Sequence, residues 1–181
     1  MRKRTDPRSM TPEEEYEAAA NTAAAMLSRR PLSEKMLLRR LREKQFSEDS
    51  IQYAAERMRL LGALDDTAYA ELIVRSYRAK GCGKLRIRQE LQQRGIPREI
   101  SQEALEEFEP DWDAMTALLH KKLRGDVSDR TEVDKACAAL QRKGFSFSQI
   151  RQALASYCEQ LDEQEDSIQK EDMSTCPFNW E

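Results

Sequence analysis

Apolar side chains recur along this chain at the period of a helix and not at that of a strand. Three segments, which begin at Ile51, Val133 and Ile150, carry apolar residues at positions i, i+3, i+4 and i+7. This spacing gathers the apolar side chains on one face of each helix. A further helix is expected ahead of each pair of such helices, at about residues 14–29, 66–78 and 111–124. The pattern therefore predicts nine helices.

A longer pattern occurs three times, over residues 37–46, 87–96 and 136–145, and each copy ends in a basic residue, a turn residue and an apolar residue. The central leucines of the copies, Leu41, Leu91 and Leu140, are 50 and 49 residues apart. A constant period of this size is typical of tandem supersecondary units. The sequence therefore predicts an all-α chain with a mobile N-terminal segment, three three-helix repeats and an acidic, disordered tail, at residues 1–12, 13–62, 63–109, 110–158 and 159–181.

The expected starts of several helices carry the residues that cap a helix. Ser33, Ser47 and Ser146 each follow an apolar residue and precede another by four positions, which is the pattern of a hydrophobic staple around an N-cap. In the second repeat the connection looks one residue shorter, so Pro97 is expected at the first helical position, N1.

Composition supports the helical interpretation and limits the cellular setting. Charged residues make up 35% and aromatic residues only 7%, a mixture that favours helices over strands. The four cysteines form no Cys-x-x-Cys pair and are interpreted as reduced thiols. No apolar run approaches the roughly 20 residues of a membrane span, and acidic residues follow the basic N-terminus where a secretory signal needs an apolar run. We therefore expect a cytoplasmic protein without a membrane contact.

The net charge of −3 conceals blocks of opposite sign. Residues 73–98 contain eight basic residues and one acid, and residues 28–44 contain seven basic residues and two acids. Residues 159–181 contain eight acids and one lysine. Such segregation indicates a basic body that attracts anionic partners, followed by an acidic tail.

Residues 81–84 read Gly-Cys-Gly-Lys and invite comparison with a phosphate-binding loop. That motif requires glycine at position 78 and serine or threonine at position 85, where this chain has Arg78 and Leu85. The segment is therefore interpreted as a flexible hinge between two helices, in which the N-terminus of the following helix is able to meet a phosphate.

Other candidate chemical sites are weaker. Asp65 and Asp66 directly precede a helical pattern, so they are interpreted as a helix cap and not as a metal pair. His120 is the only histidine, and no neighbour of fixed geometry orients it for catalysis. The sequence shows neither a Cys/His metal cluster nor a paired-carboxylate motif. We therefore expect no enzymatic activity, no cofactor and no metal.

The basic blocks are the feature with functional content. Lys84, Arg88 and Gln92 lie one helical turn apart and form a stripe, from which Arg86 and Arg94 are angularly separated. Such a stripe suits a phosphate backbone or an acidic protein surface, and the alternative is a solvated polar face. The candidate binding residues are Arg39, Arg40, Arg75, Arg78, Lys84, Arg86, Arg88 and Arg94.

Residues in the middle of the chain resemble the central signature of the RecX regulatory proteins. Residues 62–70 read Gly-Ala-Leu-Asp-Asp-Thr-Ala-Tyr-Ala, and residues 87–96 contain an Ile-Arg-Gln-Glu-Leu helix that ends in Arg-Gly-Ile. Ala63 departs from the signature, which commonly has an aromatic residue there. The resemblance covers about residues 14–158, and it implies three tandem three-helix units in an elongated, curved array.

The resemblance also implies a function. RecX proteins bind the RecA recombinase, free and in its filament on DNA, and restrain its ATPase, strand-exchange and co-protease activities, and so modulate DNA recombination, DNA repair and the SOS response. The implied partners of this chain are the RecA filament and, more weakly, single- or double-stranded DNA, and the chain is expected to be a monomer. The family pattern supplies no catalytic residues.

Two other interpretations remain open. The first is a stand-alone nucleic-acid-binding protein that uses the second and third helices of each unit in a helix-turn-helix manner. Against it, no expected recognition helix concentrates the Asn, Gln and Arg residues that read bases. The second is a helical scaffold without nucleic-acid contact, for which partner binding would be insensitive to salt.

Overall fold

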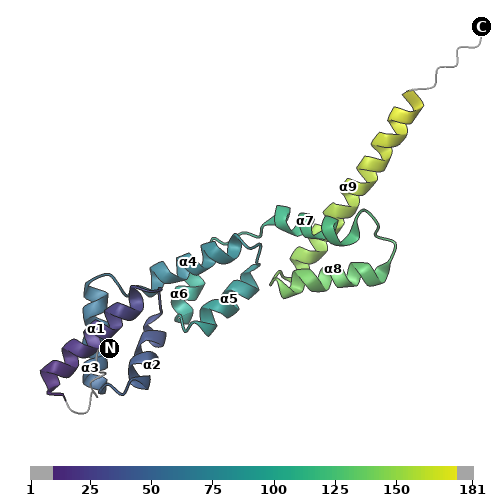
Figure 1. Cartoon of the computed structure of the whole chain (residues 1–181). Coiled ribbons are helices and arrows are strands. Elements are labelled where there is room, and N and C mark those ends of the chain that lie inside the picture. Colours follow the sequence, from purple (N-terminus) through teal and green to yellow (C-terminus); the bar gives the residue numbers. More distant parts are fainter. Residues whose placement is uncertain (1–9, 175–181) are drawn as a thin grey trace, which may run out of the picture. The chain divides into compact units, whose positions relative to one another are not determined.

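The computed structural model describes the backbone of residues 10–174 and the side chains as far as Glu163. This part of the chain contains nine α-helices and no strand (Figure 1), so the prediction of an all-α fold is confirmed. The helices are α1 (Pro12–Leu27), α2 (Glu34–Glu43), α3 (Glu48–Leu60), α4 (Asp66–Arg78), α5 (Lys84–Gln93), α6 (Arg98–Glu103), α7 (Trp112–Leu123), α8 (Arg130–Arg142) and α9 (Phe147–Ser174).

The helices belong to two compact units, each of which is described by itself. The N-terminal unit comprises the residues up to Tyr77 together with Ile87–Phe108, and so holds α1 to α3, most of α4 and α5, and α6. The C-terminal unit comprises Arg78–Arg86 and the residues from Glu109 onward, and so holds the α4–α5 turn and α7 to α9. The division between compact units therefore runs through the middle repeat.

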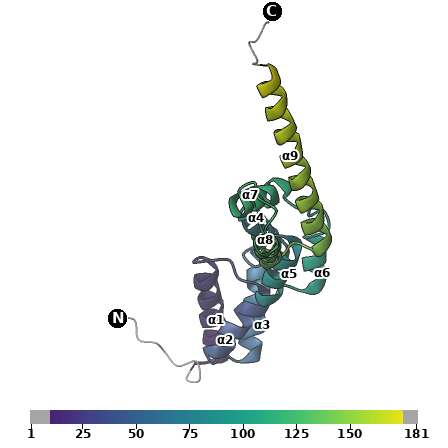
Figure 2. The same cartoon turned by 90° about the vertical axis from the view of Figure 1, so that its right-hand side faces the viewer.

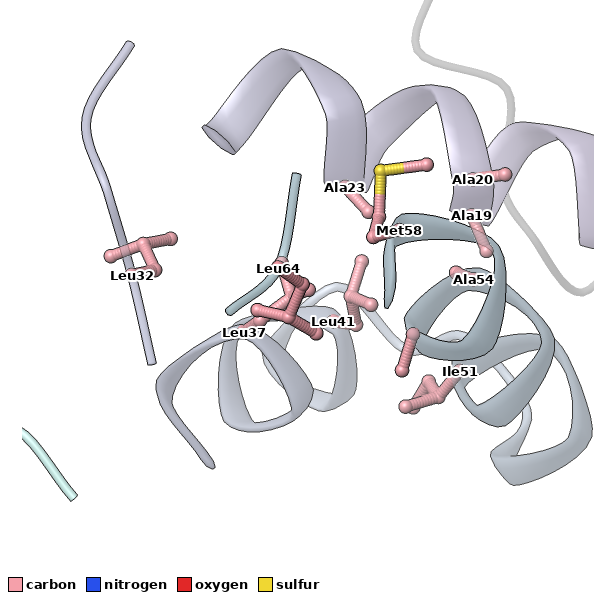
Figure 3. Close-up of a cluster of buried hydrophobic side chains, with 11 residues drawn as sticks. Ala19, Ala20, Ala23, Leu32, Leu37, Leu41, Ile51, Ala54, Met58 and Leu64 are labelled. Carbon is pink, nitrogen blue, oxygen red and sulfur yellow. The ribbon is translucent and has the colours of Figure 1, made fainter. Parts of the chain in front are cut away.

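A cluster of buried side chains from α1, α2 and α3 forms a core in the N-terminal unit (Figure 3). Leu37 and Leu41 of α2 are fully buried, and each contributes about 1.5–3 kcal/mol by leaving water. The four apolar positions predicted on α3, from Ile51 to Met58, are all buried. α1 packs against α3 (Figure 2) with small side chains, which are Ala19, Ala20 and Ala23.

The core of the C-terminal unit is built in the same way from α7, α8 and α9. Met115 of α7, Leu140 of α8 and Tyr157 of α9 are fully buried. The hydroxyl of Tyr157 accepts a hydrogen bond from the backbone N–H of Gly125 at 3.0 Å, so the one polar atom of this side chain is satisfied. The ring of His120 meets that of Tyr157 edge-on at 4.7 Å between centroids, which is a packing contact and not a catalytic one.

The threefold pattern of the sequence corresponds to one type of helix end, the Schellman motif, at the ends of α2, α5 and α8. In this motif an N–H bonds to the carbonyl five residues earlier, and the three bonds join Phe46 to Leu41 at 3.4 Å, Ile96 to Leu91 at 3.1 Å and Phe145 to Leu140 at 3.3 Å. The residue before each donor adopts the left-handed conformation, with φ of 67° at Gln45, 77° at Gly95 and 90° at Gly144.

The predicted serine caps are present. Ser33, Ser47 and Ser146 accept hydrogen bonds from the backbone N–H three residues on, each at 3.3 Å. The prediction for Pro97 is wrong, because Pro97 is the N-cap of α6 and Arg98 is the first helical residue. The connection is not shorter in the second repeat, so Pro97 stands in the place of Ser47 and Ser146 without a side chain able to accept the capping bond.

The two ends of the described chain differ from expectation. α1 begins at Pro12, where Thr11 forms a capping box with Glu14, slightly ahead of the predicted start. Residues 159–174, which were expected to belong to a disordered tail, are helical, because α9 continues to Ser174 and Leu161 packs against the core. The residues after 158 contain good helix formers and no glycine, and proline first appears at Pro177. The expected mobility of residues 1–9 and 175–181 falls outside the described residues.

Candidate binding surface

Side chains join the start of α2 to the end of α5 and the start of α4 within the N-terminal unit. The buried hydroxyl of Ser33 donates to the backbone oxygen of Arg94 and also accepts from the N–H of Met36. Asp66 Oδ1 accepts from the N–H of Glu34 at 2.8 Å. We call this contact the side-chain joint, defined by Ser33, Asp66 and Arg94.

Asp65 and Asp66 divide the capping between two helices. Asp65 Oδ1 accepts from the N–H of Ala68 at 2.9 Å and caps α4, as predicted, whereas Asp66 caps α2. Burial raises the pKa of Asp66 above its ordinary value, and the nearby charges of Glu34 and Asp65 add to the rise, while the hydrogen bond from the Glu34 backbone opposes it. The sequence did not reveal this second role, because Asp66 lies 32 residues from Glu34 along the chain.

Backbone groups make the corresponding contact in the C-terminal unit. The N–H of Gly83 donates to the Lys143 carbonyl at 2.8 Å, and the N–H of Leu85 donates to the Gly144 carbonyl at 3.1 Å. Lys143 Nζ in turn donates to the carbonyl of Lys80 at 2.9 Å. We call this contact the glycine joint, defined by Gly83, Lys143 and Gly144.

The glycine joint overturns the interpretation of residues 81–84 as a flexible hinge that presents a phosphate site. Gly81 and Gly83 are buried, and the N–H groups of Gly83 and Leu85 already donate to carbonyls of the α8–α9 turn. The backbones approach so closely that a Cβ on Gly83 would lie 2.4 Å from the Gly144 carbonyl oxygen, and one on Gly144 would lie 2.2 Å from the Arg86 nitrogen. No side chain fits at that distance, so the glycines serve close packing and not phosphate binding.

Arg94, a predicted binding residue, is engaged inside the N-terminal unit. Its Nε lies 2.6 Å from Glu90 Oε1, and its Nη1 donates to the hydroxyl of Tyr69 at 2.7 Å. Burial lowers the pKa of Arg94, but the hydrogen bonds to Tyr69 and Glu90 outweigh burial and raise the pKa above its ordinary value. Arg94 therefore positions α5 against α4 and is removed from the candidate surface.

A groove of about 930 Å³ lies in the N-terminal unit between α2, α5 and α6. Four cationic side chains line it, namely Lys35, Arg42, Arg88 and Arg98. The other lining residues include two acids, two glutamines and several apolar residues, which are Glu34, Asp66, Gln92, Gln102, Leu38, Ile96 and Pro97. Of the eight predicted binding residues, Arg88 is the one that lines this groove, and Gln92 of the predicted stripe lies one turn from it.

The cations of the groove differ in their partners. Arg42 forms a two-bond ion pair with Glu48, with its Nε 2.7 Å and its Nη2 2.9 Å from the carboxylate oxygens. Within the described residues, Lys35, Arg88 and Arg98 take part in no ion pair or side-chain hydrogen bond. Three cationic groups are therefore available to a ligand along one groove.

The remaining predicted residues lie elsewhere. Arg75 and Arg78 are exposed on the last turns of α4, and Lys84 and Arg86 lie in the first turn of α5, where Lys84 is half-buried. On α2, Arg40 is half-buried, and Arg39 is exposed with its Nε 3.6 Å from Glu43. An exposed pair of this kind contributes at most about 1 kcal/mol, so Arg39 is easily recruited by a partner.

The described part of the chain has neither a metal-binding cluster nor a membrane-spanning helix. No group of three or more His, Cys, Asp or Glu side chains is arranged to hold a metal ion there. Likewise, no helix among those described has the length and apolar character needed to cross a bilayer.

Family models match the three repeats in order. Those for the first, second and third three-helix domains of RecX match residues 19–58, 65–105 and 109–154. The chain belongs to the RecX family. RecX proteins are regulators and not enzymes, so the interpretation of this chain as a non-enzymatic regulator is confirmed.

Curated relatives agree over most of their length. "Regulatory protein RecX" of Halorhodospira halophila is 33% identical over 142 residues, which cover 77% of this chain and 88% of the relative. The protein of the same name in Xanthomonas axonopodis pv. citri is 35% identical over 133 residues, which cover 72% of this chain and 82% of the relative.

Solved RecX structures share the fold. The crystal structure of RecX from Lactobacillus salivarius matches with a TM-score of 0.73 at 24% identity, over 80% of this chain and 97% of the other. A second crystal structure, of regulatory protein RecX, matches with a TM-score of 0.65 at 27% identity, over 76% of this chain and 72% of the other. The tandem three-helix architecture is thus common to this chain and to both structures.

Proposed function

We propose that this chain binds the RecA recombinase, free and in its filament on DNA, and inhibits its ATPase, strand-exchange and co-protease activities. Through these activities it modulates recombination, DNA repair and the SOS response, and it acts in the cytoplasm as a monomer. The observation that carries the proposal is the ordered match of three successive domains to the RecX regulators. The three matched ranges cover residues 19–58, 65–105 and 109–154, which is most of the part of the chain that the structure describes.

The charge distribution supports a filament as the target. The unpartnered cations of the groove and the exposed Arg75 and Arg78 are carried by four helices of the first two repeats, α2, α4, α5 and α6. Several weak contacts of this kind act together when the target itself repeats, because each additional contact forms at a high effective concentration. A repeated polymer with an anionic surface, such as a protein filament on DNA, meets that description.

The test is to add the protein to preformed RecA filaments on single-stranded DNA and to follow ATP hydrolysis. We expect inhibition at protein concentrations well below those that saturate bare single-stranded DNA. Inhibition that appears only at the concentration that saturates bare DNA would instead favour simple competition for DNA, and an unchanged hydrolysis rate would refute the proposal.

Direct contact with DNA is part of the proposal. The test of this contact is how the affinity for DNA depends on salt concentration. The affinity for DNA falls steeply with salt if several phosphates are neutralised, since each phosphate contact releases counterions. We expect replacement of Arg75 and Arg78 by glutamate to lower DNA affinity and to flatten this dependence. An equal salt slope in the variant and the unchanged chain would place the DNA contact elsewhere.

A further inference from the structure

We infer that the groove between α2, α5 and α6 receives an acidic polypeptide segment and not nucleic acid. The segment has the chemistry of an apolar side chain flanked by carboxylates. The inference deepens the proposed function and rests on it, because it names which component of the filament this part of the surface contacts.

The cationic groups of the groove are placed to receive carboxylates. Lys35 comes from α2, Arg88 from α5 and Arg98 from α6, so the charges converge on the groove from three helices. None of the three has an ion pair or side-chain hydrogen bond among the described residues. Arginine forms two parallel hydrogen bonds to a carboxylate, which fixes the orientation of a bound acidic side chain as well as its position.

The apolar residues of the groove favour a polypeptide. Leu38, Ile96 and Pro97 line the same groove as the cations. Leu38 is half-buried, Ile96 is buried with 5% of its surface exposed, and Pro97 is exposed. An apolar side chain of a bound segment would lose water against them. A groove for single-stranded nucleic acid relies on aromatic side chains on which bases stack, and none of the residues that line this groove is aromatic.

The polar groups of the groove point to the same occupant. Gln92 and Gln102 offer carboxamides that both donate and accept hydrogen bonds, as the peptide backbone requires of a partner. Glu34 and Asp66 line the groove as well, and each already has a partner, since Glu34 Oε1 lies 3.2 Å from Arg59 Nη2 and Asp66 Oδ1 accepts from the N–H of Glu34. A continuous row of phosphates would place negative charge against both acids, whereas a polypeptide is able to place its carboxylates against the cations and backbone N–H groups against the acids. A volume of about 930 Å³ is that of a large ligand pocket, which suits a short segment.

Site-specific photocrosslinking tests the inference with the full chain. A diazirine side chain is placed at position 92, which lines the groove, and in a matched variant at position 93, the next residue of α5, which does not line it. Each variant is added to RecA filaments on labelled single-stranded DNA, its inhibition of ATP hydrolysis is measured, and the sample is irradiated.

We expect the variant at position 92 to give an adduct with the filament protein in about tenfold higher yield than the variant at position 93, and no adduct with DNA. An adduct with DNA from position 92, equal yields from both positions, or no adduct from position 92 despite full inhibition would each overturn the inference. If the unmodified chain inhibits no hydrolysis, the proposed function itself fails and the inference fails with it.

Charge reversal gives a second measurement. Arg88→Glu with Arg98→Glu changes the charge by the same amount as Lys121→Glu with Lys122→Glu, a pair of exposed residues at the end of α7. We expect the groove pair alone to weaken binding of DNA-free RecA, by about tenfold or more, while both pairs weaken binding of oligo-dT to a similar and small extent. Equal effects of the two pairs on RecA binding, or a selective loss of oligo-dT binding by the groove pair, would reject the inference. Thermal unfolding of both variants shows whether they are folded.

Discussion

The side-chain joint and the glycine joint solve the same packing problem with different chemistry. Ser33 and Gly83 occupy corresponding places 50 residues apart, each just ahead of the second helix of its repeat. Ser33 reaches the neighbouring turn with its hydroxyl, whereas Gly83 reaches it with its backbone N–H. The backbones therefore approach more closely at the glycine joint, where there is no room for even one Cβ.

The residue with positive φ at the end of α2, α5 and α8 also depends on how closely a neighbouring backbone approaches it. Gln45, Gly95 and Gly144 all have positive φ, so the conformation by itself does not decide the residue type. Gln45 is exposed, a Cβ at Gly95 would meet the flexible side chain of Lys35 at 3.0 Å, and one at Gly144 would meet the backbone of Arg86 at 2.2 Å. Positive φ alone therefore does not exclude a side chain, as Gln45 shows, whereas the neighbouring backbone at Gly144 leaves no room for one.

The largest expected effect is that of Gly144→Ala. The added Cβ would clash with the backbone of Arg86 and would also be strained by the positive φ, so we expect a loss of about 3 kcal/mol or more. Urea unfolding monitored by circular dichroism measures it. Gly62→Ala is the matched control, because Gly62 has φ of 64° with no atom within 4 Å of the Cβ, and its expected cost is only about 1–2 kcal/mol. Equal losses for both variants would refute the importance of the close approach.

At the side-chain joint, Ser33→Ala is expected to cost about 1–2 kcal/mol. It removes the acceptor of the Met36 N–H at the start of α2 and leaves the backbone oxygen of Arg94 without its hydroxyl donor. Ser33→Thr keeps a hydroxyl and serves as the comparison in the same unfolding experiment. A Ser33→Ala variant as stable as the unchanged chain would show that packing alone holds this joint.

The Asp66 contact gives a prediction with a pH dependence. Asp66→Ala leaves the N–H of Glu34 without its acceptor and should cost about 1 kcal/mol, whereas Asp66→Asn keeps an oxygen acceptor. Because the pKa of Asp66 is raised in the folded state, the folded protein holds this proton more tightly than the unfolded one. Its contribution to stability therefore falls as pH rises from the ordinary pKa through the raised one.

The Asp66→Asn variant has no such titration. Its stability relative to the unchanged chain should rise through the same pH window and stay constant above it, as measured by urea unfolding between about pH 3 and pH 7. A difference that does not vary with pH would contradict the assignment of the raised pKa to the half-buried carboxylate of Asp66.

The smallest expected effect is that of Gln45→Gly. Glycine relieves the strain of the positive φ but makes the unfolded chain more flexible, so we expect a change of about 1 kcal/mol or less, in the stabilising direction. A loss above that range would reveal an unrecognised contact of the Gln45 side chain. Thermal unfolding of the variant beside the unchanged chain measures it.

The sequence was sufficient to predict the fold, but it predicted only part of the candidate binding surface. Helical periodicity located the buried faces, and the recurring leucine, basic residue and turn residue marked the ends of α2, α5 and α8, because both patterns depend on neighbours within one helix. The groove of Lys35, Arg88 and Arg98 was not predicted, since its residues come from three helices that only the packing brings together. Charge density selected Arg94 as readily as Arg88, and only the contacts with Tyr69 and Glu90 separate them.

The two joints also set an order in which the chain can be completed. The hydroxyl of Ser33 bonds to the backbone oxygen of Arg94, 61 residues later in the chain. The carbonyl of Lys80 accepts from Lys143, 63 residues later. During synthesis on the ribosome, the hydrogen bonds at the start of the second helix of one repeat are therefore unable to form until the following repeat has emerged. Each newly synthesised repeat supplies the hydrogen-bond partners of the repeat before it, so we expect the joints to form in order from the N-terminus to the C-terminus.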